Sequence, residues 1–400
     1  MRIAIVGMLC EPSKATEGSV SWHWAMAYMR LGHEVALFTE ASQRSNFTAS
    51  ELASGIAIHF VGSNRRVEKT PSSPLHAFRL LMQIADWNRA IENVVDELHS
   101  FDMVHQVSIS TIRVPTSLTS LGGKLVWGPL GGAHVGHTRG VSIRALPLEL
   151  LRNASIAYAR LRYRSRHWFR KFRGLILTTN EETARFARTL GARNVIIELS
   201  DGLQESWLAN QSRPKPPTGE ISLLWAGRLV GSKRPDLAIR TIATLNASGK
   251  RCAHLTICGD GPERHRLTEL ARRLGVDDSI EFRGAVAHSE VRELLERTDV
   301  ALFTSFRDSS APFLVEALGM GVSAVAVRTQ GVETCFPREI VPGPSANIPE
   351  GQIAEQLAYW IDQAGTRDRK NDMAFAATHT WASKARRILA LAVQNSSSRV

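Results

Sequence analysis

The chain has 400 residues, of which 44% are hydrophobic and 22% are charged, and its formal net charge is +11. Single hydrophobic cores stop growing at roughly 250 to 300 residues, so this length predicts two domains, and the composition excludes a largely disordered chain. No run of about 20 apolar residues that could span a membrane is present, and the four cysteines lack the paired spacing of a zinc site or a disulfide framework.

Short apolar runs alternate with helical patterns through the first half of the chain. The apolar start, residues 1–10, is too short for the core of a secretory signal, so we expect a cytoplasmic protein. A helix is expected to begin at Ser19 and to end at Gly32, since glycine suits the position after a helix. Strands are predicted at residues 3–6, 35–38, 56–60, 103–107, 125–127, 175–178 and 195–197. This alternation is typical of an α/β domain with a mostly parallel sheet.

The positive charge is concentrated between Arg139 and Arg173, where ten basic residues occur with one acidic residue, Glu149. Within this segment arginines are interleaved with Leu161, Tyr163, Trp168, Phe169 and Phe172. Such a mixture is typical of peripheral proteins that contact anionic lipid. A solvated helix and a rim for an anionic acceptor are the alternatives. Nucleic acid is not expected as a partner, because no nucleic-acid-binding signature accompanies the charge.

Residues 210–219 interrupt the alternation with three prolines and no apolar periodicity, which is typical of a linker. A second series of strands is predicted at residues 221–226, 255–258, 280–282, 300–303 and 323–327. Two such sheets in tandem form a cleft, where open α/β sheets bind ligands at the carboxyl ends of their strands. The expected organisation is a first domain, a linker, a second domain and a C-terminal helix across the hinge, at residues 1–205, 206–219, 220–379 and 380–400.

The turn after the first strand of the second domain combines glycine with cations. It contains Gly227, Arg228 and Leu229, and Lys233 and Arg234 precede a proline that suits the first position of a helix. Backbone N–H groups at a helix N-terminus attract phosphate, and two cationic side chains strengthen that attraction. The alternative is an ordinary turn between strand and helix with solvated side chains.

A second polar turn leads into a predicted helix that ends at Gly321. The residues at its start are helix-capping types, namely Asp308, Ser309 and Ser310, and Pro312 fits the first turn. Glu316 falls one turn further on, so two carboxylates bracket the helix N-terminus. This arrangement can bind hydroxyls at a carboxylate and an anion at the backbone N–H groups. The alternative is that Asp308 only caps the helix and that Glu316 is only solvated.

These two turns and their spacing resemble the family-four retaining glycosyltransferases, or glycosyl transferases group 1. In that family a G-R-L-x-x-x-K turn and an E-x7-E motif that continues as A-x-x-x-G form the donor site. The matching residues here are Gly227, Arg228, Leu229, Lys233, Asp308, Glu316, Ala317 and Gly321. The motifs GDGPE at 259–263 and FRGAV at 282–286 also follow the family's order. The resemblance covers the second domain and implies the GT-B fold, in which two Rossmann-like parallel-sheet domains face a central cleft and the C-terminal helix crosses back.

The first domain resembles the family more loosely. Gly18 lies at the usual position of a glycine-rich loop, and RLGHEV at 30–35, TTNEET at 178–183 and SDGL at 200–203 resemble further family elements. The sequence WGPLGG at 127–132 resembles a bacterial subgroup with a G-P-x-G-G loop, in which Asp-Ser often replaces the first glutamate of the E-x7-E motif.

The resemblance implies a division of roles between side chains. Arg228 and Lys233 would hold the donor diphosphate, Glu316 the ribose hydroxyls and Asp308 the donor sugar, so Asp308, Arg228 and Lys233 are the candidate catalytic residues. Further candidates for donor binding are Gly227, Gly259, Arg283, Pro312, Phe313 and Leu314. The candidates on the acceptor side are Gly18, Gly131, Gly132, His105 and His134. No metal and no cofactor beyond the nucleotide-sugar is expected, and the sequence lacks an Asp-x-Asp pair.

Both histidines have a structural alternative. His105 ends a predicted strand and would point towards the cleft, but histidines at strand ends are also typical of hydrogen-bonded structural positions. His134 follows the GPLGG loop, where it could act on the acceptor hydroxyl or simply be solvated.

The function predicted is retaining transfer of a hexose from a nucleotide-sugar to an acceptor hydroxyl, in surface polysaccharide or lipid-linked glycan assembly, at the inner face of the membrane. The alternatives are a glycosyltransferase for small-molecule natural products, a sugar-nucleotide epimerase of the same fold, and a non-catalytic membrane-associated module. A dinucleotide oxidoreductase is not expected, because the turn after the first strand lacks G-x-G-x-x-G. Asp308, Ser323 and Pro312 depart from the family pattern, and these departures bear on the choice of donor.

Overall fold

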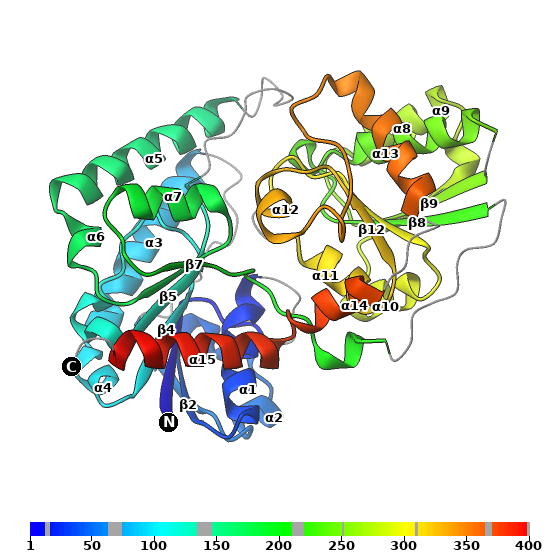
Figure 1. Ribbon diagram of the computed structural model, residues 1–400. Coiled ribbons are helices and arrows are strands. Elements are labelled where there is room, and N and C mark those ends of the chain that lie inside the picture. Colours follow the sequence, from blue (N-terminus) through cyan, green and yellow to red (C-terminus); the bar gives the residue numbers. More distant parts are fainter. Residues whose placement is uncertain are drawn as a thin grey trace. The chain divides into compact units, whose positions relative to one another are not determined.

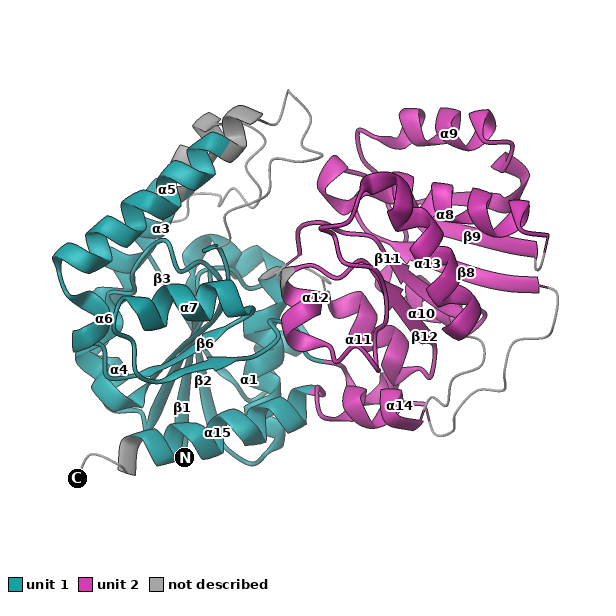
Figure 2. Ribbon diagram, turned by 45° about the horizontal axis from the view of Figure 1, so that its top comes forward, with its two compact units in different colours: residues 1–138, 143–202, 381–400 teal, residues 139–142, 203–380 magenta. Residues whose placement is uncertain are grey.

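The computed structural model describes residues 1–12, 17–62, 74–133, 146–209, 220–249, 252–308, 311–364 and 370–397. The chain divides into two compact units (Figure 2). Unit 1 comprises residues 1–138, 143–202 and 381–400, and unit 2 comprises residues 139–142 and 203–380. The C-terminal helix therefore belongs to unit 1, and the predicted linker at 210–219 lies outside the described residues.

Unit 1 contains a parallel sheet whose strands, in the described part of the chain, follow the order β3-β2-β1-β4-β5-β6-β7 (Figure 1). The strands are β1 (Arg2–Gly7), β2 (Glu34–Glu40), β3 (Ala57–Val61), β4 (Met103–Ser108), β5 (Leu125–Leu130), β6 (Leu175–Thr178) and β7 (Val195–Ile197). All strands predicted for the first half of the chain are thus confirmed. Their carboxyl ends lie at one edge of the sheet because neighbouring strands pair in parallel.

Both faces of this sheet are apolar and covered by helices. Ile3 and Ile5 enter one core with α1 (Val20–Arg30) and α15 (Trp381–Ser397). Their neighbours Ala4 and Val6 enter the opposite core with α3 (Pro74–Glu92) and α5 (Leu146–Ser165), because successive strand residues point to opposite faces. The remaining helices of unit 1 are α2 (Ala49–Leu52), α4 (Val95–His99), α6 (Trp168–Lys171) and α7 (Glu181–Thr189), with 3-10 turns η1 (Glu17–Ser19), η2 (Ala41–Asn46) and η3 (Leu118–Lys124).

The limits of α1 agree with the prediction, although its start is capped differently. Ser19 occupies the N-cap position, but its side chain makes no capping hydrogen bond. At the other end Gly32 has φ +84°, and His33 N donates to Tyr28 O over 3.3 Å. A residue in this left-handed conformation is favoured as glycine, which is why the helix ends there.

Unit 2 contains a parallel sheet in the order β10-β9-β8-β11-β12. The strands are β8 (Glu220–Ala226), β9 (Cys252–Cys258), β10 (Ile280–Gly284), β11 (Val300–Phe303) and β12 (Ser323–Ala326), which confirms the second predicted series. The helices are α8 (Pro235–Ala247), α9 (Arg264–Arg273), α10 (His288–Leu295), α11 (Pro312–Gly319), α12 (Gln330–Cys335), α13 (Glu350–Ala364) and α14 (Lys370–Ala377), with 3-10 turns η5 (Glu205–Trp207), η6 (Gly231–Lys233) and η7 (Asp277–Ser279). Two Rossmann-like parallel-sheet units are the fold that the sequence predicted.

A buried lysine attaches α15 to the sheet of unit 1. Lys384 is fully buried, and its Nζ donates to Leu199 O and, over 2.8 Å, to Asp201 O. The buried Glu198 carboxylate lies 3.7 Å from Lys384 Nζ and 2.6 Å from Arg387 Nη2. Trp381 packs against Trp24 of α1 at the same place. The last helix is therefore fastened by charge as well as by apolar contact.

Candidate donor site

The turn after β8 is locked against the turn after β9. Gly227 N donates to Cys258 O and Leu229 N donates to Asp260 O, each over 2.9 Å. A Cβ atom on Gly259 would lie 1.9 Å from Gly227 O, and Gly259 has φ +128°, so no other residue fits there without moving the backbone. The two glycine motifs singled out in the sequence therefore form one backbone platform at the carboxyl ends of β8 and β9.

Lys233 and Asp308 meet at this edge of the sheet. Lys233 ends η6, after β8, and its Nζ forms an ion pair with the Asp308 carboxylate beyond β11. The strands β8 and β11 are neighbours, and the loops that follow them are joined because Thr304 Oγ1 donates to Lys233 O over 3.0 Å. The side chains of Lys233 and Asp308 are 28% and 18% exposed, so a ligand can reach both.

The second cation of the turn, Arg234, has another role than the phosphate contact considered from the sequence. Arg234 is buried, and its Nε and Nη2 donate to Asp236 Oδ1 and Oδ2 over 3.0 and 2.9 Å. Glu350 of α13 pairs with it as well. Burial alone would raise the pKa of Asp236, but the hydrogen bond and charge of Arg234 outweigh burial and lower it. Arg234 therefore stabilises the start of α8, and Lys233 is the side chain of the pair that faces the proposed ligand.

The helix α11 begins differently from the capped helix that the sequence suggested. Pro312 occupies its first turn as predicted, but the N-cap residue is Ala311, with φ +28°, and Asp308 lies outside the cap. Residues 309 and 310 lie outside the described residues. Phe313 and Leu314 are 7% and 0% exposed, so their side chains belong to the core. Only their backbone could serve the donor binding predicted for them.

Glu316 is held by a histidine that the sequence analysis did not single out. His288 Nε2 lies 2.8 Å from Glu316 Oε1, and the ring of His288 stacks on Trp207 with centroids 4.7 Å apart. The guanidinium of Arg292 lies 6.0 Å from the Trp207 ring. Glu316 is 20% exposed, which fits a carboxylate oriented at a binding surface better than the solvated residue of the alternative interpretation. His288 directly follows the FRGAV motif and precedes a helix, but nothing in its local pattern marks it as a partner of Glu316.

The two remaining arginines of the predicted site differ in their partners. Arg283 Nη1 and Nη2 lie 3.0 and 2.8 Å from carboxylate oxygens of Glu281 and Glu290, and the hydrogen bond to Glu290, followed by that to Glu281, raises the pKa of Arg283. A donor phosphate would have to compete with both carboxylates for this side chain. Arg228 is exposed, and no described carboxylate forms an ion pair with it. Arg228 is therefore the better of the two for a donor phosphate.

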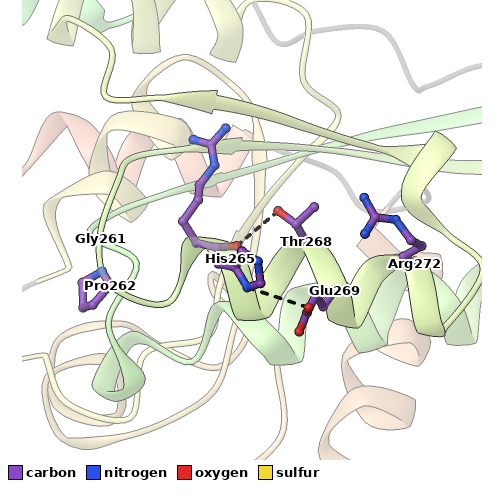
Figure 3. Close-up of a pocket in the computed structure, with 7 residues that line it drawn as sticks. Gly261, Pro262, His265, Thr268, Glu269 and Arg272 are labelled. Atoms are coloured by element: carbon purple, nitrogen blue, oxygen red, sulfur yellow. Dashed lines mark hydrogen bonds and ion pairs between the residues drawn. The ribbon is translucent and has the colours of Figure 1, made fainter.

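A shallow hollow of unit 2 lies apart from these residues (Figure 3). It is lined by Gly261, Pro262, Arg264, His265, Thr268, Glu269 and Arg272. His265 Nδ1 lies 3.9 Å from Glu269 Oε1 within it. None of the predicted donor residues is among its lining residues, so the hollow does not define the candidate site.

The acceptor-side candidates of unit 1 are placed as follows. Gly18 packs on Glu11, since a Cβ atom there would lie 2.8 Å from Glu11 Oε2. Gly131 N donates to Ser110 O over 2.9 Å, and Gly132 has φ +94°. A Cβ atom on Gly132 would lie 2.9 Å from Thr111 Oγ1. These glycines permit close packing of loops. His134 lies outside the described residues.

His105 is a structural residue of the core, contrary to the expectation that it points towards a ligand. It is fully buried in β4, with Nδ1 accepting a hydrogen bond from Tyr28 OH over 3.1 Å and Nε2 donating to Gly128 O over 2.8 Å. Its ring also meets Trp24 edge to face. Burial lowers the pKa of His105 to about 4, and the charge of Lys384 acts in the same direction. The imidazole is therefore neutral at physiological pH, and no acceptor reaches it.

This buried imidazole predicts a loss of stability in mild acid. The unfolded chain binds a proton at His105 below the ordinary pKa of 6.5, whereas the folded chain does so only near 4. The free energy of unfolding should thus fall by about 3 kcal/mol as the pH drops through that window. Glu40, whose pKa burial raises to about 7, opposes this trend. We therefore expect the difference in free energy of unfolding between wild type and His105→Gln to shrink by about 3 kcal/mol from pH 7 to pH 4 in urea titrations. A constant difference would contradict the burial argument.

The aromatic residues of the basic segment face inwards, contrary to the expectation of lipid contact by them. Tyr163, Phe169 and Phe172 are buried, with Tyr163 OH donating to Ile112 O over 2.7 Å. Trp168 is partly buried and stacks on Phe172 with centroids 5.1 Å apart. Their apolar surface is spent on the core of unit 1. Residues 139–145 of this segment lie outside the described residues.

Two parallel-sheet units, one carrying cations and carboxylates at the carboxyl ends of its strands, define the GT-B class of fold. Solved structures with this fold include a sucrose-phosphate synthase from Thermosynechococcus elongatus, with a TM-score of 0.66, 15% identity and coverage of 99% of both chains. The Anabaena protein HepE, solved with UDP and glucose, has a TM-score of 0.58 and 15% identity over 98% of this chain and 99% of that one.

The family assignment comes from the sequence of unit 2. Residues 209–372 match the family model of glycosyl transferases group 1, and this part of the chain belongs to that family. A phosphatidylinositol N-acetylglucosaminyltransferase protein from Arabidopsis thaliana is 30% identical over 127 residues, which are 32% of this chain and 28% of that protein. D-inositol 3-phosphate glycosyltransferase 2 from Catenulispora acidiphila is 28% identical over 193 residues, or 44% of each chain. The matches thus span less than half the length of these curated relatives.

Proposed function

We propose that this protein transfers a sugar from a nucleotide-sugar donor to an acceptor hydroxyl, as a hexosyltransferase. The observation that carries the proposal is the meeting of Lys233 and Asp308 at the strand ends of a unit that matches glycosyl transferases group 1. The donor would be bound by unit 2. That HepE was solved with UDP and with glucose supports a nucleotide-sugar as the kind of donor.

The proposed roles follow from the charges of the site. Departure of the nucleotide leaves a diphosphate with growing negative charge, which Lys233 and Arg228 would stabilise where it forms. Glu316, oriented by His288, would accept hydrogen bonds from the ribose hydroxyls. Asp308 would contact the donor sugar once the diphosphate competes for Lys233. Because two cations are present, we expect the transfer to need no metal and to persist in a chelator.

The transfer is proposed to retain the anomeric configuration. The bond from the anomeric carbon to the phosphate oxygen breaks, and the acceptor oxygen bonds to the same carbon from the same face. The acceptor proton passes to an oxygen of the departing phosphate, so no side-chain nucleophile is needed. An inverted product in an anomer-resolved NMR spectrum would contradict this part of the proposal.

The acceptor is proposed to be a glycan or a lipid-linked glycan bound by unit 1, in surface polysaccharide assembly. The protein would then work in the cytoplasm at the inner face of the membrane, with the basic segment 139–173 in contact with anionic lipid. A small-molecule acceptor, a sugar-nucleotide epimerase and a non-catalytic membrane module are the competing functions. The epimerase would convert a donor without any acceptor, and the module would bind no nucleotide.

The first test is nucleotide binding by the intact protein. Thermal unfolding is measured with UDP, GDP, ADP, TDP and their sugars on wild type, on Glu316→Ala and on Glu293→Ala, a control that removes an exposed carboxylate of α10. A ligand at 100 times its dissociation constant stabilises a protein by about 2.7 kcal/mol. We expect one nucleotide to raise the melting temperature of wild type and of the control. Loss of the hydrogen bonds to a charged Glu316 should weaken binding roughly 10- to 100-fold. No response to any nucleotide would contradict the proposed function.

A further inference from the structure

The helix α5 presents a row of large apolar side chains to solvent. Leu150, Tyr158 and Leu161 are 59%, 67% and 66% exposed, and Leu151 is 42% exposed. Side chains three, four, seven and eight residues apart share one face of a helix, so Leu150, Tyr158 and Leu161 belong to one stripe. Four of the large apolar side chains that unit 1 exposes thus gather on a single helix.

The opposite face of α5 fixes this stripe outwards. Ile156, Ala159 and Tyr163 are 3%, 1% and 1% exposed and belong to the core beneath the helix. The hydrogen bond from Tyr163 OH to Ile112 O ties the helix to the loop after β4. Figure 1 shows α5 along the margin of unit 1. Rotation of α5 to bury the stripe would therefore break the core of unit 1.

Arginines lie on both flanks of the stripe. Arg160 and Arg164 are exposed on one side of the helix, and Arg162 is partly exposed on the other. No aspartate or glutamate occurs in the sequence between Leu150 and Asn180. An apolar stripe bordered by arginines is the pattern of a helix that lies in the interface of an anionic bilayer, with the apolar side chains among the acyl chains and the arginines at the phosphates.

We infer that the exposed face of α5, formed by Leu150, Leu151, Tyr158 and Leu161 between its arginines, is the surface with which this protein binds anionic lipid. The inference deepens the membrane contact proposed above and replaces the buried aromatics with a different set of side chains. The helix lies on the bilayer and does not cross it, because no helix among the described residues is long and apolar enough to span one. Contact between two copies through this face is disfavoured, because a two-fold interface would bring the arginines of both copies together.

The test is flotation of the intact protein with vesicles of phosphatidylcholine alone and of phosphatidylcholine mixed with phosphatidylglycerol. We expect binding to the mixed vesicles only. Tyr158→Ser/Leu161→Ser should reduce that binding at least tenfold, because each exposed apolar side chain loses its transfer into lipid. Arg164→Gln/Arg166→Gln should reduce it roughly tenfold or more, at about fivefold per arginine near an anionic surface.

Matched controls remove the same kinds of side chain from unit 2. Tyr359→Ser replaces an exposed tyrosine of α13, and Arg240→Gln/Arg297→Gln removes two exposed arginines. Both should bind mixed vesicles as wild type does. Wild type that stays unbound, α5 variants that float like wild type, or a dimer in sedimentation that Tyr158→Ser/Leu161→Ser abolishes would each overturn the inference. Nucleotide-induced thermal shifts on the same α5 variants should equal those of wild type, so failure of lipid binding is distinguished from failure of the proposed transfer.

Discussion

Lys233→Ala is expected to lower kcat/KM of the proposed transfer by roughly 100- to 1,000-fold, the usual cost of removing one preorganised group that stabilises developing negative charge. The ammonium lies at the carboxyl end of β8 and already pairs with Asp308, which holds it in place before the donor arrives. The loss should appear mainly in kcat, because the charge on the diphosphate grows as the sugar departs. Steady-state transfer of a radiolabelled sugar measures both constants.

The control for this prediction removes a cation elsewhere in unit 2. Arg297→Ala, at an exposed position, should leave kcat/KM unchanged. Asp308→Asn tests the pairing, because Lys233 and Asp308 should show strong coupling in a double-mutant cycle. A Lys233→Ala enzyme with wild-type kcat would exclude a role in charge stabilisation, and additive single mutants would show that the ion pair is incidental.

Glu198→Ala is expected to destabilise unit 1 by about 3 to 5 kcal/mol, since breaking a buried pair leaves an uncompensated charge. Lys384 is fully buried, and without Glu198 its ammonium would keep the carbonyls of Leu199 and Asp201 but lose the carboxylate. Urea unfolding followed by tryptophan fluorescence should report the change, because Trp24 and Trp381 lie 5.3 and 5.2 Å from Lys384 Nζ.

Two variants separate the buried charge from simple loss of packing. Glu355→Ala, on the exposed surface of α13, should change the free energy of unfolding by less than about 0.5 kcal/mol. Glu198→Gln/Lys384→Met removes both charges and keeps most of the volume, so it should be more stable than Glu198→Ala. Equal destabilisation by the double and the single variant would refute the argument from charge.

The fold was predictable because its signals are local. Each strand of both sheets is a short apolar run between turn residues, and runs such as residues 3–6 and 300–303 need no knowledge of their neighbours to be recognised. Gly32 ends α1 for an equally local reason, since its φ of +84° suits glycine. The family motifs added the order of the elements, which periodicity alone does not give.

The candidate site was predictable only in part. The G-R-L and E-x7-E motifs identify Lys233 and Asp308, and the structure brings them together through adjacent strands β8 and β11. His288 was missed, because its bond to Glu316 joins residues 28 positions apart that no sequence pattern relates. Arg234 looked equivalent to Lys233 in the sequence, but Asp236 and Glu350 neutralise it in the structure.

The sequence by itself determined the two α/β units and the composition of the donor motifs, since both depend on residues close together in the chain. Only the tertiary structure decided which polar and aromatic side chains are buried. His105 and Tyr163 became core residues, while Leu150, Tyr158 and Leu161 became surface. The physical reason is that the face of a helix or strand that packs inwards is chosen by the free energy of burying it against distant segments, and amphipathic patterns with apolar residues on both faces do not reveal that choice.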